Sequence, residues 1–210
     1  MKLLMLMLIA VCQLNAQNKK SENLSQQIYD DVINMYIQDY LRKHPVNIDL
    51  SEQKCDSIFL GLINGYRAQN HLTALKLIDV MDSACRLHTI WMLNRDTISH
   101  IENSLDIGGR VYYNPIDRIR RYDQSWAENH PNVYENCAVS NVRAGNDPTI
   151  QFQRISAESV ESVFRMWQKS PGHNAAMLVP DAKYLGFYIG SKFKKKQNLY
   201  LQKATMLICK

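Results

Sequence analysis

The chain has 210 residues, of which 46% are hydrophobic and 21% charged, and its formal net charge is +5. This size and composition fit one globular domain, or two small ones, with a hydrophobic core of its own. The charge is too small to indicate a nucleic-acid-binding protein, and the basic run Lys194–Lys196 is better explained as a solvated hairpin turn.

The first 16 residues have the features of a cleaved signal peptide. Lys2 is followed by the short apolar run LLMLMLIAV, and Ala16 offers a cleavage site. This run is too short to span a bilayer, and no later apolar run is long enough. We therefore expect residues 1–16 to be removed and the mature chain to be secreted or periplasmic, without a transmembrane span. The alternative is a lipoprotein anchored at Cys12, which Val11 disfavours because a small residue is expected there.

Helices are predicted in the first half of the chain. Apolar and tyrosine side chains recur at helical spacing over residues 28–41, which predicts an N-terminal helix within a segment, 17–53, that also holds a connector. The apolar stripe of this helix is typical of core packing, and docking of a partner protein is the alternative. The main domain, residues 54–210, begins with two further helices, one from Cys55 to about Tyr66 and one over about 78–94.

Strands are predicted mainly in the second half. The polar segment 95–155 contains two short strand-like pieces, at 111–113 and 133–139. A helix is expected to begin near Ser156, a favourable N-cap residue, and two β-like stretches, 184–189 and 199–209, are joined by the lysine turn. Helices that come first and strands that cluster late predict a layered α+β fold, because a parallel sheet would show alternating strands and helices.

Four cysteines remain after the signal peptide, and they are spread along the chain at Cys55, Cys85, Cys137 and Cys209. An even number of cysteines in an exported protein favours disulfides, for which three connectivities exist. The alternative is four buried free thiols. No CxxC motif is present, so neither a zinc knuckle nor a redox motif is indicated.

Two of the six histidines have a position suited to chemistry. His100 and His173 each follow a predicted helix after a short break, so their rings would be held by a helix end and stay accessible. His88 lies on the apolar face of its helix and is predicted to be a hydrogen-bonded core residue. The remaining histidines lie beside helix ends or in a loop and show no chemical pattern: His44, His71 and His130.

Glu135 is the third candidate, because a carboxylate within the strand-like VYENCAV must find a partner or face a site. Two imidazoles and a carboxylate suffice for a divalent metal with open positions, or for general acid–base catalysis. We therefore predict His100 and His173 as metal ligands, and all three residues as catalytic candidates. Their separation along the chain does not show that they meet in space.

Four blocks of the chain resemble a known family. They are INGYRAQNHLTALKLIDVMDSACRLHTIWML, ISH, YENCAV and FRMWQKSPGHNAAMLVPDAKYLGFYIG. In order and spacing they are similar to the CAP family, the cysteine-rich secretory, antigen 5 and pathogenesis-related proteins, and most of all to its bacterial SCP-like extracellular branch. The resemblance covers about residues 57–209, with SPGHN as its most specific part. It implies a three-layer α-β-α sandwich with a central antiparallel sheet, to which this chain adds the N-terminal helix.

The resemblance also implies a cleft that holds two histidines and, in many members, two glutamates. Matched block by block, His100 and His173 stand at the histidines, and Glu135 stands at the glutamate of the family's G-E-N motif. Tyr134 replaces the glycine of that motif, and Ser170 stands where eukaryotic members have the second glutamate. The Ser-Pro-Gly break is then expected to turn His173 off its helix and into the cleft.

The leading functional prediction is an exported CAP-like protein whose cleft binds a divalent cation, Zn²⁺ or another, and a small ligand. His100 and His173 would hold the cation, with Glu135 orienting or sharing the site. One alternative is a peptidase-like hydrolase that uses Glu135 with both histidines. Another is an extracellular module that binds a lipid or a protein. The sequence identifies neither the ligand nor the oligomeric state.

Overall fold

The computed structural model describes residues 52–102, 104–105, 111–143 and 155–210. The predicted signal peptide, Cys12, His44 and the N-terminal helix lie outside the described residues, so these assignments stay predictions. Among the helices that the structure describes, none combines the length and the apolar character needed to cross a membrane.

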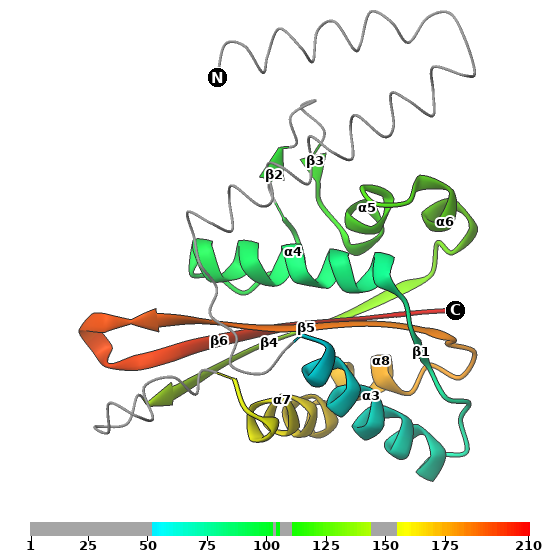
Figure 1. Cartoon of the computed structure of the whole chain (residues 1–210). Coiled ribbons are helices and arrows are strands. Elements are labelled where there is room, and N and C mark those ends of the chain that lie inside the picture. Colours follow the sequence, from blue (N-terminus) through cyan, green and yellow to red (C-terminus); the bar gives the residue numbers. More distant parts are fainter. Residues whose placement is uncertain (1–51, 103, 106–110, 144–154) are drawn as a thin grey trace, which may run out of the picture. The chain divides into compact units, whose positions relative to one another are not determined.

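Helices cover both faces of one sheet (Figure 1). The helices are α3 (Glu52–Gln69), α4 (Asp79–Arg95), α5 (Pro115–Arg120), α6 (Gln124–Asn129), α7 (Ala157–Lys169) and α8 (Pro171–Met177). The strands are β1 (Lys76–Leu77), β2 (Ser104–Leu105), β3 (Val111–Tyr112), β4 (Val133–Arg143), β5 (Tyr184–Lys194) and β6 (Leu199–Cys209). A 3-10 turn, Lys195–Gln197, joins β5 to β6, which confirms the predicted lysine hairpin turn.

The main sheet has the strand order β1-β5-β6-β4, and β2 and β3 form a separate antiparallel pair. The three long strands are antiparallel over eleven residue pairs at each interface, and β1 adds two residues parallel to β5. Helices α4, α5 and α6 lie on one face, and α3, α7 and α8 lie on the other (Figure 1). The predicted α+β fold, a three-layer sandwich around an antiparallel sheet, is confirmed.

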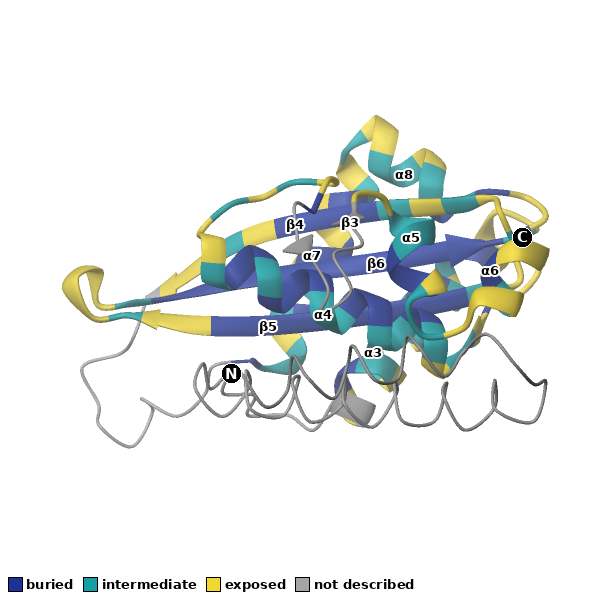
Figure 2. Cartoon of the chain, turned by 90° about the horizontal axis from the view of Figure 1, so that it is seen from above, coloured by how far each residue is buried: buried dark blue, intermediate teal, exposed yellow. Residues whose placement is uncertain are grey.

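The core lies on both faces of β5 and β6, whose central residues are buried throughout (Figure 2). Buried strands of this kind need helices on both sides. On the α3 side, the rings of Phe59 and Phe187 stack with centroids 3.9 Å apart, and Trp167 meets both rings edge-on. Sandwiched aromatic side chains thus join α3, α7 and β5.

Helix α4 lies unusually close to β5. A Cβ atom on Gly186 would lie 2.4 Å from the carbonyl carbon of Met81, so glycine is required for this approach. At its other end, α4 is capped by a buried lysine from β6. Lys203 Nζ donates to the main-chain oxygen of Met92 at 2.7 Å and also to that of Thr97. These contacts fix the helix that leads into the His100 segment.

The segment predicted as largely irregular, 95–155, contains two helices that the sequence analysis missed. Asn114 and Asp117 form a capping box at the start of α5, with Pro115 in its first turn. Asp123 caps α6. Both helices have six residues, too few for an apolar period to become visible. Strand β4 also runs four residues beyond its predicted end at 139.

The four cysteines that the structure describes form no disulfide. Cys55, Cys85, Cys137 and Cys209 are buried thiols, so the disulfide prediction is wrong and the alternative of buried thiols holds. They belong to different helices and strands of a domain with a large core, which does not depend on crosslinks. Burial raises the pKa of the Cys85 and Cys137 thiols well above the ordinary range, which keeps both protonated.

Candidate functional site

His100 lies on an irregular segment that follows α4. The helix ends at Asp96, whose backbone is left-handed, and the next six residues form neither helix nor strand. The His100 side chain is 58% exposed, and its Nδ1 lies 2.9 Å from Oε1 of Glu135 on β4. The structure therefore joins two of the three predicted site residues directly.

Both carboxylate oxygens of Glu135 are occupied. Oε1 faces His100, and Oε2 accepts from Nη2 of Arg118 on α5. Burial by itself would raise the pKa of Glu135, but the His100 hydrogen bond and the Arg118 charge outweigh it, so the pKa lies below its usual range. Because the ionised carboxylate can only accept, Nδ1 of His100 must donate, which leaves the lone pair of a neutral ring on Nε2.

Arg118 was not predicted from the sequence. Its side chain is buried, and Nη1 also donates to the main-chain oxygen of His100 at 3.3 Å. The neighbouring Arg120 points elsewhere and pairs with the partly exposed Asp117. A carboxylate buried in a strand needs a partner, so Glu135 indicated that a cationic residue lies nearby. The sequence does not show which arginine of α5 is that residue.

His88 is fully buried, which confirms its predicted place in the core. Its Nδ1 lies 3.0 Å from Oε2 of Glu102, and its Nε2 lies 2.7 Å from the main-chain oxygen of Ser99. The ring stacks on Trp91 at 5.6 Å between centroids. A second buried polar group thus contacts the segment that carries His100.

His173 was predicted to follow a helix after a short break, and it lies within a second helix, α8. Ser170 has an extended backbone and ends α7, and α8 begins at once with Pro171. Proline is favoured at this first position because its missing N–H needs no partner there. The break therefore redirects the chain into a second short helix. Asn136 on β4 fixes that helix by donating from Nδ2 to the main-chain oxygen of His173 at 2.9 Å.

His100, Glu135 and His173 line one pocket of about 460 Å³. Successive residues of a strand face opposite sides of a sheet. Glu135 faces the α4 side, where it meets His100, and Asn136 faces the α8 side, where it meets His173. The pocket therefore lies at β4, the edge strand of the described sheet, where His100 is held through Glu135 and the backbone of His173 is held through Asn136.

The pKa values of the two histidines are shifted in opposite directions. The hydrogen bond that His100 donates to Glu135 raises the pKa of His100. Burial lowers the pKa of His173, and the nearby His100 lowers it further, so His173 stays neutral at physiological pH. The effect of His100 on His173 agrees with the placement of both residues at one pocket.

Both departures from the family pattern lie at the pocket. Tyr134 and Ser170 are part of its lining, so a phenol ring and a hydroxyl replace the expected glycine and glutamate. Glu158 and Glu161 lie on the outer face of α7, at a different surface groove. Among the described residues that line the pocket, Glu135 is the one carboxylate.

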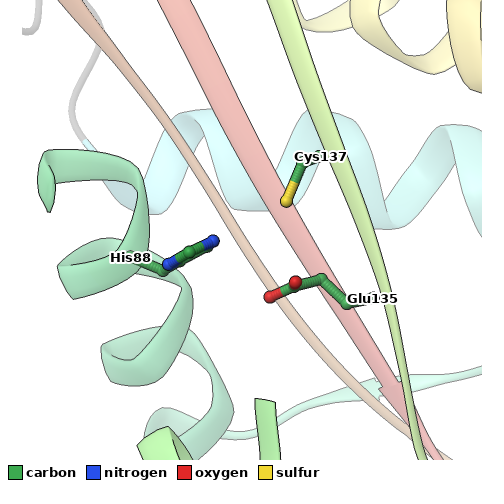
Figure 3. Close-up of side chains that lie close together, drawn as sticks. All are labelled: His88, Glu135 and Cys137. Carbon is green, nitrogen blue, oxygen red and sulfur yellow. The ribbon is translucent and has the colours of Figure 1, made fainter. Parts of the chain in front are cut away.

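A second cluster, His88, Glu135 and Cys137, brings three metal-binding side chains within 4.8 Å of one another (Figure 3). Its contacts do not suit a metal ion. Both ring nitrogens of His88 have other partners, Glu135 is paired with a guanidinium, and the Cys137 thiol resists deprotonation. We interpret the cluster as a closed polar network below the pocket.

The other histidines of the described part of the chain lie away from the pocket. His71 is exposed and follows α3 with a left-handed backbone. His130 ends α6, where it stacks on Trp126 with centroids 4.2 Å apart and contacts the main-chain oxygen of the same residue. Neither lines the pocket.

Comparison with known proteins identifies the family. The sequence profile of the cysteine-rich secretory protein family, CAP, matches residues 60–209. The chain belongs to the CAP family. Its CAP domain contains every residue of the pocket, so the resemblance seen in the sequence is confirmed. No curated protein matches the chain.

Two solved structures are similar to this CAP protein. An outer surface protein from Borrelia burgdorferi has 20% identity and a TM-score of 0.53, with 77% of this chain and 96% of that chain covered. An extracellular protein containing a SCP domain from Bacillus anthracis has 18% identity and a TM-score of 0.48, with 73% and 40% covered. At these identities the likeness concerns the fold.

Proposed function

We propose that this CAP domain binds a divalent cation, preferably Zn²⁺, through Nε2 of His100 and the imidazole of His173, in an exported protein. The observation that carries the proposal is that both imidazoles line one pocket while a buried carboxylate holds Nδ1 of His100. Metal-binding histidines commonly donate their second N–H to a carboxylate in this way. Imidazole nitrogens suit zinc, whereas calcium and magnesium prefer oxygen ligands.

Glu135 orients His100 and is not itself a ligand, because both of its oxygens already accept hydrogen bonds. Two protein ligands leave coordination positions open, so a small ligand with an oxygen or nitrogen donor can reach the cation through the pocket. A cation held there would polarise such a ligand. Tyr134 and Ser170 in the pocket lining would contact the ligand.

A peptidase-like reaction with Glu135 as general base is less well supported. A general base must reach a substrate proton directly or through one water molecule. The Glu135 side chain is 2% exposed and lies between His100 and Arg118, so it has no free oxygen to offer. Binding of a lipid or a protein through the N-terminal helix stays a prediction, since that helix lies outside the described residues.

The proposal is tested by equilibrium dialysis against Zn²⁺, followed by elemental analysis. The wild-type protein is compared with His100→Ala and His173→Ala, and with His71→Ala as a control that removes an exposed histidine distant from the pocket. We expect wild type and control to retain zinc and both pocket variants to lose it. Equal metal content in all four proteins would refute the proposal.

The pH dependence of binding has a defined direction. Zinc needs a neutral imidazole, and the pKa of His100 is raised by the Glu135 hydrogen bond. Protons therefore compete with zinc for His100 at a higher pH than they would for an ordinary histidine. His173, whose pKa is lowered, remains neutral down to a lower pH. Zinc affinity should fall as pH decreases through the titration of His100. The same dialysis at several pH values measures this.

A further inference from the structure

No helix or strand fixes the backbone of the segment that carries His100. Residues 97–102 form neither helix nor strand, and the His100 side chain is 58% exposed. A binding residue in such a place must be fixed by its supporting contacts, because the entropy of ordering it otherwise reduces affinity. The buried side chains below the segment are therefore the groups to consider.

His88 holds the segment at two points. Its Nε2 lies 2.7 Å from the main-chain oxygen of Ser99, the residue before His100, and its Nδ1 lies 3.0 Å from the carboxylate of Glu102. A main-chain oxygen only accepts, so Nε2 must carry a proton. Glu102 is itself tied down, since its N–H donates to the main-chain oxygen of Tyr113 at 3.1 Å. One buried ring thus closes the turn that presents His100.

Arg118 holds the same histidine from another direction. One of its terminal nitrogens donates to the main-chain oxygen of His100, and the other donates to Glu135, which in turn accepts from the His100 ring. A single planar guanidinium therefore fixes both the backbone and the ring partner of His100, which a point-like ammonium group cannot do equally well. Arg118 and Glu135 are both almost fully buried, which limits competition from water.

We propose that His88 and Arg118 are positioning residues that set the orientation of His100 from below the pocket. The inference rests on the proposed function in that the oriented ring is the metal ligand. The orientation itself is a property of the metal-free protein and is measurable there. His88 acts through the carbonyl of Ser99, and Arg118 acts through Glu135 and the carbonyl of His100.

Arg118→Gln tests the second contact, with Arg120→Gln as a matched control on the same helix. In metal-free protein, above the titration range of the ring, the Nδ1–H proton of His100 gives an NMR signal only if its hydrogen bond protects it from exchange. We expect the signal in wild type and in the control and its loss in Arg118→Gln, with zinc affinity about 10- to 100-fold weaker. An unchanged signal and affinity in folded Arg118→Gln would overturn the proposal. If that variant does not fold, Arg118→Lys, which can keep one of the two contacts, must show faster exchange than wild type.

His88 is tested by two variants that differ in the contact they keep. The terminal amide of His88→Gln extends towards the position of Nε2 and can still donate to Ser99, whereas the shorter His88→Asn reaches only towards Glu102. Both lose the imidazole. We expect His88→Gln to preserve the protected His100 signal better than His88→Asn, and equal exchange rates in the two would contradict a role through Ser99. Should wild type bind no zinc, the proposed function fails, and the exchange data on metal-free protein still decide the positioning proposal.

Discussion

Replacing Glu135 by glutamine changes the site with almost no change in volume. The carboxylate accepts from two donors, Nδ1 of the partly exposed His100 and the buried Arg118 guanidinium, one on each oxygen. A glutamine offers one acceptor oxygen and turns an NH₂ group towards the other donor. One of the two contacts is therefore lost, and the charge of Arg118 is left without its partner.

The expected cost follows from burial. Both side chains of the Arg118–Glu135 pair are at most 3% exposed. Removal of one member of a buried ion pair lowers the free energy of unfolding by about 3–5 kcal/mol. Because glutamine keeps the packing and one hydrogen bond, we expect a loss of about 3 kcal/mol, at the lower end of that range. Zinc affinity should also fall about 10- to 100-fold, since His100 loses the carboxylate that orients it.

Urea unfolding of the metal-free protein measures the first effect. Glu161→Gln is the control, because Glu161 forms an exposed ion pair with Arg165 on α7 that should contribute about 0.5 kcal/mol or less. The double variant Glu135→Gln/Arg118→Gln carries no unpaired charge and should be more stable than the sum of the single losses predicts. A stability for Glu135→Gln equal to that of the control, or strict additivity in the double variant, would refute this reasoning.

Two further predictions concern α4. Gly186→Ala places a Cβ against the backbone of Met81 and should lower the free energy of unfolding by about 1–3 kcal/mol. The control Gly61→Ala, which meets open space on α3, should not destabilise the protein. Thermal unfolding of both variants measures the difference, and equal midpoints would contradict the prediction. Burial lowers the pKa of Lys203 to about 8 from its ordinary 10.5. The unfolded chain therefore binds more protons between these values, and stability should rise with pH from about 8 to about 10.5. Urea unfolding across this range should show no such rise in Lys203→Met, and the same slope in both proteins would contradict the assignment.

The layers of the fold were predictable because they depend on long periodic segments. The helices that became α3, α4 and α7 each show several apolar residues at helical spacing, and Ser156 caps the last of them as expected. The sequence also predicted β6 with its observed bounds, 199–209. The helices α5 and α6 depend on local caps such as Asn114 and Asp123 within a polar segment, where no periodic signal exists.

The candidate site was predictable in its members and not in its contacts. His100, Glu135 and His173 have chemical character that the sequence displays, and family resemblance placed them in one cleft. Arg118 and Glu102 could not be found in this way, because a charged residue in a polar segment looks the same whether it is solvated or buried against a partner. The disulfide prediction failed for a related reason. The number of cysteines indicates pairing, but the distances between them are set by the fold.

Strand β4 is the edge of the described sheet, and its first residues line the pocket. A further strand paired with its first residues, from another copy or from a bound peptide, would cover Val133 to Asn136, which line the pocket. Edge-to-edge pairing at this place would therefore compete with binding of the proposed ligand in the pocket. An oligomer that leaves the pocket accessible would form through other surfaces of the molecule.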